Sequence, residues 1–248
     1  MDDRPALWVL DLGNTRLKLG RFVGTRLAEA FTYPRARAGE ALDVLLAEPG
    51  DAYAVLSTGA LAEEAAWRER LGAAGPVWSY EPGAPTVVEV AYATPGTLGT
   101  DRLAAAAGAR ALYGGRAALV VDVGTCITYE LIDPAGVYRG GAISPGPAMR
   151  LDAMHQFTGR LPRVREAAPG GFPGGSTAAA LLEGGVAGAA HEVAGFVASF
   201  RADHPGGAVV ACGGGFALLR PLLPAGIDHR PHLVLEGLAT MHAYAHAQ

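Results

Sequence analysis

Hydrophobic residues occur in short runs along the chain, separated by polar residues and glycines, and the spacing of the runs predicts the elements. In the first half the pattern gives three strands, a helix, a strand and a second helix. These elements are predicted at about residues 6–12, 17–23, 27–33, 39–48, 53–57 and 61–71.

After Asp122 the same order of elements begins again. The second half is predicted to contain strands at about 117–123, 127–132 and 136–143, helices at 146–157 and 176–202, a strand at 208–212 and a short helix after Gly215. A repeated order of this kind indicates an internal duplication, in which each copy builds a mixed sheet covered by helices. The sequence therefore predicts an α/β fold with two lobes, residues 1–112 and 113–248. A helix that begins near Asp101 joins them.

Composition narrows the classes of protein that fit this pattern. Half of the 248 residues are hydrophobic and 18% are charged, which excludes an extended disordered chain. The net charge of −4 and the dispersed arginines give no surface typical of nucleic-acid binding. The Ala- and Gly-rich stretch at 178–200 is interrupted by polar residues, so we expect a packed helix and no membrane partner. An acidic start and only two cysteines predict a cytoplasmic protein.

The two halves share one short motif, an apolar run that ends in Asp-x-Gly. It appears at Leu7–Thr15 and again at Ala118–Cys126, and in each copy a buried strand turns at the glycine and enters a second strand. A bare glycine backbone beside a carboxylate can approach a phosphate closely. Two such turns across a cleft could hold a nucleoside triphosphate and its cation.

Asp11 and Asp122 are the carboxylates of these turns. Strand-end carboxylates at a nucleotide site bind Mg²⁺ directly or through water, or hold a monovalent cation. An Asp after a strand can also simply cap a turn, but its occurrence in two matching contexts favours function. Lys18 is the single lysine in the sequence, against nineteen arginines. It is either a strand residue with no special role or an ammonium group that binds phosphate.

A third motif leads into the predicted helix near Asp101. Thr100 or Asp101 stands where an N-cap belongs. Asp101 also stands where a carboxylate could accept the proton of a substrate hydroxyl. Arg102 could bind a carboxylate through bidentate hydrogen bonds. The pattern alone leaves both roles open.

Glycine-rich turns at other strand ends could approach a nucleotide too. The turn at Gly213–Gly215 would let a base or ribose lie against the backbone, and Thr177 exposes a hydroxyl at the start of the long helix. His242 and His246 have a metal-compatible helical spacing, but no further ligand is near in sequence, so we interpret them as part of a solvated tail.

The motifs taken together resemble those of the type III pantothenate kinases, in the order that family shows. The matching segments are Asp11–Lys18, Gly99–Arg102, Asp122–Thr128, Gly140–Gly146 and Arg230–Leu238. The resemblance implies an actin-like ATPase (ribonuclease H-like) fold with two similar lobes around a nucleotide cleft. It also implies ATP-dependent phosphorylation of pantothenate, with Mg²⁺ and a monovalent cation, K⁺ or NH₄⁺, and a homodimer whose interface helps to form the pantothenate pocket.

Carried over by motif, the resemblance gives each candidate residue a role. Asp101 would be the proton acceptor, Asp122 would bind the monovalent cation and Asp11 would bind Mg²⁺ directly or through water. The residues implied to bind ATP and its phosphates are Asp11, Gly13, Asn14, Thr15, Lys18, Gly124, Thr125, Gly213 and Gly214. Those implied to line the pantothenate site are Tyr92, Gly99, Thr100, Asp101, Arg102 and Thr177.

Two positions depart from the family pattern, since Cys126 and Glu130 stand where Ala and Asp are common. Two other functions remain open at this point. One is a non-catalytic regulatory or accessory protein of the same family, and the other is a kinase for a different small acid or sugar.

Overall fold

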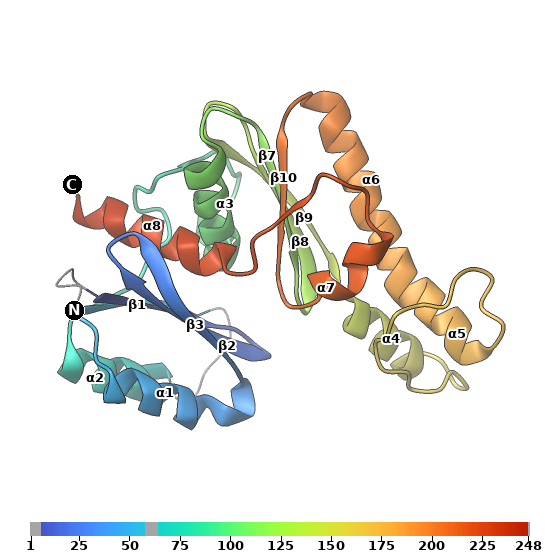
Figure 1. Ribbon diagram of the computed structural model, residues 1–248, viewed down its shortest axis with the longest axis horizontal. Coiled ribbons are helices and arrows are strands. Elements are labelled where there is room, and N and C mark those ends of the chain that lie inside the picture. The colour runs from blue at the N-terminus through green and yellow to red at the C-terminus, as the bar shows by residue number, and fades with distance from the viewer. Residues whose placement is uncertain (1–5, 58–63, 248) are drawn as a thin grey trace. The chain divides into compact units, whose positions relative to one another are not determined.

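The chain forms two compact units in the computed structural model, which describes residues 6–57 and 64–247 (Figure 1). The first unit consists of the described residues up to Gly114, of Gly136–Arg139 and of the residues from His232 onward. The second unit consists of Gly115–Ala135 and Gly140–Pro231.

A five-stranded mixed sheet forms the centre of the first unit, in the order β3-β2-β1-β4-β5. Its strands are β1 (Ala6–Leu12), β2 (Arg16–Val23), β3 (Arg26–Pro34), β4 (Ala52–Ser57) and β5 (Val77–Trp78). Helices α1 (Ala38–Ala47) and α2 (Glu64–Ala74) lie on one face of this sheet, and α8 (Leu233–His246) packs on the other (Figure 1). Trp8, Leu10 and Tyr53 are fully buried in this core.

Helix α8 also packs tightly against α3 (Thr100–Tyr113), and glycines make the close approach possible. A Cβ added at Gly237 would lie 1.7 Å from the carbonyl oxygen of Ala104, and one added at Gly108 would lie 2.7 Å from that of Leu233. Neither space admits a side chain. The two helices therefore cross almost backbone to backbone.

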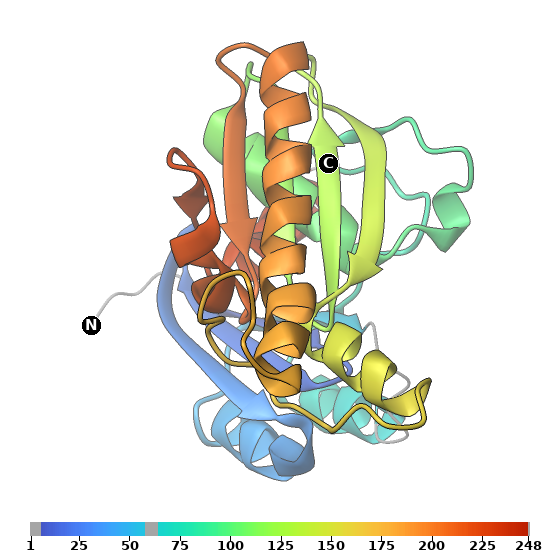
Figure 2. The same cartoon turned by 90° about the vertical axis from the view of Figure 1, so that its right-hand side faces the viewer.

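The second sheet has six strands in the order β11-β10-β7-β8-β9-β6. The strands are β6 (Glu89–Val90), β7 (Ala118–Val123), β8 (Cys126–Ile132), β9 (Val137–Pro145), β10 (Ala208–Cys212) and β11 (Asp228–His229), and the short β6 pairs with Val137–Tyr138. The helices of the second unit are α4 (Pro147–Gln156), α5 (Thr177–Leu182), α6 (Gly188–Asp203) and α7 (Phe216–Leu219). Helix α6 runs along the sheet of the second unit (Figure 2).

Apart from β6, the two sheets repeat one strand order, because β9-β8-β7-β10-β11 corresponds to β3-β2-β1-β4-β5. In both, the first two strands form an antiparallel hairpin and the fourth pairs in parallel with the first. The predicted α/β fold with two mixed sheets is thus confirmed, and the repeated strand order agrees with an internal duplication.

Several elements differ in detail from the sequence prediction. The long helix expected at 176–202 is interrupted by a π-helical turn at Glu183–Ala187 between α5 and α6. The part of the predicted helix at 61–63 lies outside the described residues, and α2 begins at Glu64. The chain after His232, expected in the second lobe and as a tail, forms α8 in the first unit.

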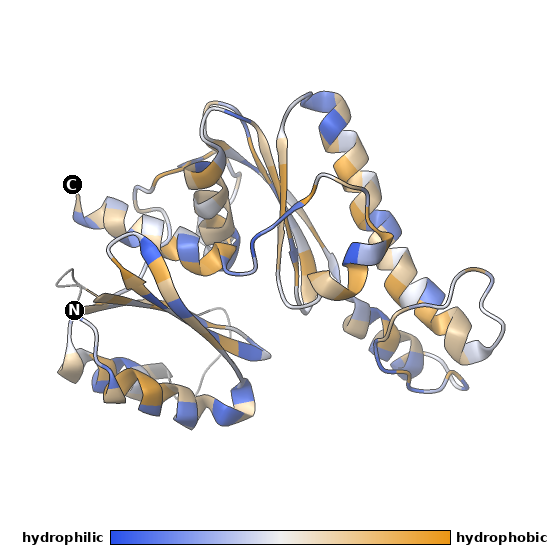
Figure 3. Ribbon diagram, in the orientation of Figure 1, coloured by the Kyte–Doolittle hydropathy of each residue, from blue (hydrophilic) through white to orange (hydrophobic). Residues whose placement is uncertain are grey.

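Hydrophobic and hydrophilic residues are mixed along the surface helices α1 and α6 (Figure 3). In α6 the buried positions include Val193, Val197 and Phe200, which belong to the core of the second unit. Within residues 6–57 and 64–247, no helix has the length and apolar character needed to cross a bilayer.

Candidate functional site

The hairpin between β1 and β2 carries the first group of candidate phosphate-binding residues. Asp11 and Lys18 are paired across its two strands, and Lys18 Nζ lies 3.4 Å from Asp11 Oδ2. Asp11 is only 7% exposed. A buried carboxylate needs a compensating charge, and the ammonium group of Lys18 supplies one.

The turn of this hairpin depends on Gly13. Its N–H donates to the carbonyl of Arg16 at 3.1 Å, and an added Cβ would lie 2.9 Å from that oxygen. Asn14 and Thr15 are exposed at the tip. The first predicted turn therefore presents open backbone next to a buried carboxylate, an arrangement in which a phosphate could lie close to the chain.

The start of α3 differs from the capping expectation. The N-cap is Gly99, so neither Thr100 nor Asp101 caps the helix. Asp101 lies in the first turn, where the helix dipole favours a negative charge, and its Oδ1 accepts a hydrogen bond from the Arg102 N–H at 2.9 Å. An added Cβ at Gly99 would lie 2.5 Å from this oxygen. Glycine thus leaves room for the carboxylate to fold back over the helix start.

Arg102 and Tyr92 lie together, as a shared substrate site would require. The guanidinium carbon of Arg102 lies 6.0 Å from the centre of the Tyr92 ring, and this ring lies 6.0 Å from that of Tyr138. Arg102 is 7% exposed. A guanidinium held over an aromatic face is largely desolvated, which strengthens its interaction with an anion.

In the second unit, the hairpin of β7 and β8 repeats the first turn. The Gly124 N–H donates to the carbonyl of Cys126 at 2.8 Å, and Asp122 is in register with Cys212 on the neighbouring strand β10. Gly213, which follows, has a φ of +85°, and an added Cβ would lie 2.2 Å from Asp122 Oδ1. The structure thus brings together Asp122 and the glycine turn that the sequence placed at the nucleotide.

The starts of α4 and α5 also lie in the second unit. Gly146, the N-cap of α4, donates its N–H to the carbonyl of Thr125 at 3.0 Å, so this junction lies directly on the second turn. Ser176 caps α5 by accepting a hydrogen bond from the Ala179 N–H at 3.2 Å. Thr177 is exposed in the first turn of α5.

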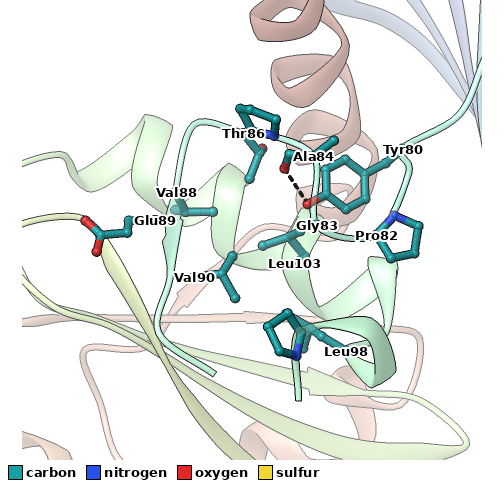
Figure 4. Close-up of a pocket in the computed structure, with 12 residues that line it drawn as sticks. Tyr80, Pro82, Gly83, Ala84, Thr86, Val88, Glu89, Val90, Leu98 and Leu103 are labelled. Atoms are coloured by element: carbon teal, nitrogen blue, oxygen red, sulfur yellow. Dashed lines mark hydrogen bonds between the residues drawn. The ribbon is translucent and has the colours of Figure 1, made fainter. Parts of the chain in front are cut away.

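A pocket of about 420 Å³ lies in the first unit and is lined mainly by the segment from Tyr80 to Leu98, which precedes α3 and contains several prolines and glycines (Figure 4). Its walls include Val88, Leu98 and Leu103, and the Tyr80 hydroxyl donates across it to the carbonyl of Ala84 at 2.8 Å. The pocket shares a wall with the first turns of α3 but is lined by none of the predicted substrate residues.

The C-terminal histidines lie on α8 rather than in a solvated tail. The ring of His242 lies 5.5 Å from that of Trp78, edge to face, and 4.1 Å from that of His246. Burial, with a smaller effect of His246, lowers the pKa of His242 to about 4. The interpretation as a solvated tail is wrong for His242, which packs into the first unit.

Comparison with known proteins decides the family. The sequence profile of the type III pantothenate kinases matches residues 7–199. A type III pantothenate kinase of Bacteroides fragilis is 36% identical over 232 residues, covering 93% of this chain and 94% of the relative. One from Porphyromonas gingivalis is 35% identical, with coverage of 93% and 95%.

This chain belongs to the type III pantothenate kinase family. The resemblance that the sequence motifs carry is thereby confirmed.

Solved structures support the fold. A protein of Campylobacter jejuni described as a Baf family transcriptional activator superposes with a TM-score of 0.61 at 19% identity, over 97% of this chain and all of that one. An activator of 2-hydroxyisocaproyl-CoA dehydratase from Clostridium difficile, solved with bound ADPNP, gives 0.51 at 14% identity, with coverage of 98% and 97%. At these identities the likeness concerns the fold alone.

The cations implied by the type III pantothenate kinase family fit the donor chemistry of the two turns. Asp11 and Asp122 offer hard carboxylate oxygens at strand ends, the donors that Mg²⁺ and K⁺ prefer. Among the described residues no cluster of three His, Cys, Asp or Glu side chains occurs. Mg²⁺ in kinases is typically held by one or two carboxylates together with water and substrate phosphates. One carboxylate in each turn fits that mode.

One polar group of the second unit escaped the sequence analysis. Glu192 on α6 accepts hydrogen bonds from Tyr129 and Ser144 and forms an ion pair with Arg150. Its only signal in the sequence is an acidic residue inside an otherwise Ala- and Gly-rich helix. The partners lie more than 40 positions away in the chain, so no local pattern could have joined them.

Proposed function

We propose that this protein transfers the γ-phosphoryl group of ATP to the primary hydroxyl of pantothenate, giving 4′-phosphopantothenate in the first step of coenzyme A biosynthesis. The observation that carries the proposal is family membership over nearly the whole chain, together with the presence of Asp11, Asp101 and Asp122. A protein that only bound nucleotide would not need a carboxylate at the start of α3 beside a desolvated arginine.

In the proposed reaction Asp101 is the general base. The Arg102 N–H holds one of its oxygens, which orients the carboxylate so that it can take the proton from the attacking hydroxyl. A positioned base of this kind contributes about 10²–10⁴-fold to the rate. Arg102, buried beside Tyr92, would bind the carboxylate of pantothenate and so fix the distance from that group to the reacting hydroxyl.

Phosphoryl transfer depends mainly on positioning and on neutralising charge. The Gly13 and Gly124 turns would let backbone approach the phosphates, and Lys18 would add a positive charge while it pairs with Asp11. Asp11 would hold Mg²⁺ and Asp122 a monovalent cation, and these cations would spread the charge of the transferred group.

A coupled ADP-release assay over several acceptors tests the proposal. We expect turnover with pantothenate and none above background with acetate or hexoses. Turnover with acetate or a hexose instead would assign the protein to another branch of the kinase superfamily. Nucleotide binding without turnover on any acceptor would favour a regulatory role.

The cation assignment has its own test. Replacing K⁺ by Na⁺ at constant ionic strength should sharply lower the pantothenate-dependent rate. The Asp122→Asn variant should lose this dependence on K⁺, because its amide carries no charge to hold the ion. Equal rates of the wild type in K⁺ and Na⁺ would refute the role of Asp122.

A further inference from the structure

The backbone of the second phosphate-binding turn is in close contact with the junction of β9 and α4. A Cβ added at Gly146 would lie 2.4 Å from the carbonyl oxygen of Gly124 and 2.6 Å from that of Thr125. The Gly146 N–H also donates to the Thr125 oxygen at 3.0 Å. Tightly packed backbone segments cannot move independently by even a few tenths of an ångström. A shift of Gly146 would therefore move the Gly124–Thr125 turn with it.

The residues on either side of Gly146 are fixed by one carboxylate from α6. The Ser144 hydroxyl and an Arg150 Nη donate to separate oxygens of Glu192. Arg150 Nε donates back to the carbonyl of Pro145 at 2.8 Å. The strand end before the junction and the first turns of α4 after it are therefore attached to the same group, and α4 lies beside the N-terminal part of α6 (Figures 1 and 2).

Glu192 is also attached to the strand that leaves the second turn. The Tyr129 hydroxyl on β8 donates to Glu192 Oε1 at 2.8 Å, and the Tyr129 ring stacks on Phe196 with a centroid distance of 4.1 Å. Glu192 therefore connects β8, the β9–α4 junction and α6, the segments on both sides of Gly124–Thr125.

The ionisation states of Glu192 and Tyr129 favour stable hydrogen bonds within this cluster. Burial opposes ionisation of Glu192, but the hydrogen bonds from Ser144, Arg150 and Tyr129 outweigh it and lower its pKa. Burial, and next the bond to Glu192, raise the pKa of the Tyr129 phenol, so it stays a donor. Hydrogen bonds to a charged group are shorter and stronger than neutral ones.

We infer that Glu192 is a positioning residue for nucleotide binding, which holds the Gly124–Thr125 turn in place through Ser144, Arg150 and the Gly146 contact. This inference rests on the proposed binding of ATP phosphate at that turn. Glu192 itself touches no substrate in this role; it acts through the junction, so its loss changes nucleotide affinity more than pantothenate affinity.

The Glu192→Gln variant provides the test. A glutamine has one acceptor oxygen and an NH₂ group, whereas Tyr129, Ser144 and Arg150 present donors to both oxygens of Glu192. Whichever way the glutamine amide is oriented, at least one of these donors would face its NH₂ group and lose its hydrogen bond. We expect the Kd for the Mg²⁺ complex of β,γ-imido-ATP, measured by calorimetric titration, to rise about tenfold, the effect of one charge-assisted hydrogen bond. The KM for pantothenate should stay within about twofold.

Asp203→Asn is the matched control, since Asp203 is exposed at the far end of the same helix. It should leave the nucleotide Kd and the KM for pantothenate unchanged. The Glu192→Asp variant keeps the charge and should recover part of the affinity. If Glu192→Gln does not fold, Ser144→Ala removes a single donor and should raise the nucleotide Kd about threefold.

An unchanged nucleotide Kd in a folded Glu192→Gln variant would overturn the inference, as would an equal rise in the nucleotide Kd and in the KM for pantothenate, which indicates general loosening. The oligomeric mass of each variant is checked beside the wild type. A wild type that binds the ATP analogue but does not phosphorylate pantothenate would refute the proposed function alone, because the titration needs no acceptor.

Discussion

Asp101 sits in the first turn of α3 although the glycine before Thr100 provides the N-cap, so its carboxylate is not needed to begin the helix. The Arg102 N–H holds one of its oxygens, which fixes the direction of the side chain. The sequence left capping and catalysis open at this position. The structure removes capping as an explanation and leaves a half-buried, oriented carboxylate beside a buried arginine.

We expect the Asp101→Asn variant to lose about 10²–10⁴-fold in kcat, because the amide can accept the same backbone hydrogen bond but cannot take a proton. The measurement is pantothenate-dependent ADP release at saturating substrates. Asp43→Asn, an exposed position on α1, serves as the control and should retain full activity. A kcat near that of the wild type in Asp101→Asn would remove this residue from the catalytic role.

At the residue scale, the sequence could identify groups whose chemistry and position are both local. Asp11 and Asp122 stand at strand ends next to a glycine, and Gly213 follows an apolar strand, so pattern alone locates them. The contact of Gly213 with Asp122 needs the parallel pairing of β10 with β7, which joins segments about 90 residues apart. The contacts of Glu192 with its partners also depend on packing between segments that are far apart in the sequence.

Among the elements, the crossing of α3 and α8 depends most on particular residues. Gly237 lies against the backbone of Ala104 with no room for a methyl group. The clash is with a carbonyl oxygen, which cannot rotate away as a flexible side chain could. The two helices must separate to admit any larger residue.

The Gly237→Ala variant should therefore lower the free energy of unfolding by about 2–3 kcal/mol, since overpacking outweighs the higher helix propensity of alanine. Gly195→Ala in α6 is the matched control, because an added Cβ there meets nothing within 4 Å. It should raise stability by about 0.5–1 kcal/mol. Urea denaturation measures both, and equal stability of the two variants would show that the helices can separate without cost.

Helix α8 also gives the protein a pH-dependent term through His242. With its folded pKa near 4 and its ordinary value at 6.5, the ring is neutral in the folded state and becomes charged first in the unfolded chain. The contribution of the neutral His242 ring to the free energy of unfolding is fully present above about pH 6.5 and is lost as the pH falls towards 4. We expect the free energy of unfolding to fall by on the order of 1 kcal/mol over this range, because water partly screens the half-exposed ring.

The measurement is the urea midpoint of unfolding at pH 7.5 and at pH 5. The His242→Phe variant keeps an aromatic contact with Trp78 but cannot titrate, so its midpoint should fall less between the two pH values. His246→Gln, one turn later on α8, removes only the smaller cause of the lowered pKa, so its midpoint should fall nearly as much as that of the wild type. An equal fall in all three proteins would exclude His242 as the source.

Most elements could be predicted because their signal is local. Strands β1 and β10 have the predicted bounds, and the ends of the other strands of the two hairpins, β2, β7 and β8, differ from prediction by at most one residue. Helix α8 was missed as an element because its polar last turns resemble a tail and its partner α3 lies more than 100 residues earlier. The π-helical turn in the long helix occurs at a Gly-Gly pair, where the sequence shows only a weak helix former.

At the scale of the whole molecule, the duplicated strand order explains why the carboxylates occur as a pair. Each copy ends its first strand in Asp-x-Gly and turns into an antiparallel partner. The remainder of each copy has diverged: α1 alone follows the third strand in the first, whereas α4, α5 and α6 follow it in the second. The hairpins are therefore the part that the two copies share, and the additional helices belong to the second copy alone.

The second unit also exposes apolar side chains on three of its elements, β9, α4 and α6. Ile143 precedes Ser144, Met149 precedes Arg150 and Phe196 stacks on Tyr129; the three are 61%, 38% and 39% exposed. Exposed apolar side chains lose contact with water when another surface covers them. Since the family resemblance implies a homodimer, we expect a second copy of the chain to cover them.

Light scattering during size-exclusion chromatography should then give twice the 25.4 kDa mass of one chain. Ile143→Asp should shift the mass towards the monomer at low micromolar concentration, because a carboxylate would have to be buried without a partner. Leu222→Asp, equally apolar and 40% exposed but on the short helical turn after α7, should leave the mass unchanged. A dimer that persists in Ile143→Asp would move the interface to another face, and a monomeric wild type would remove the dimer altogether.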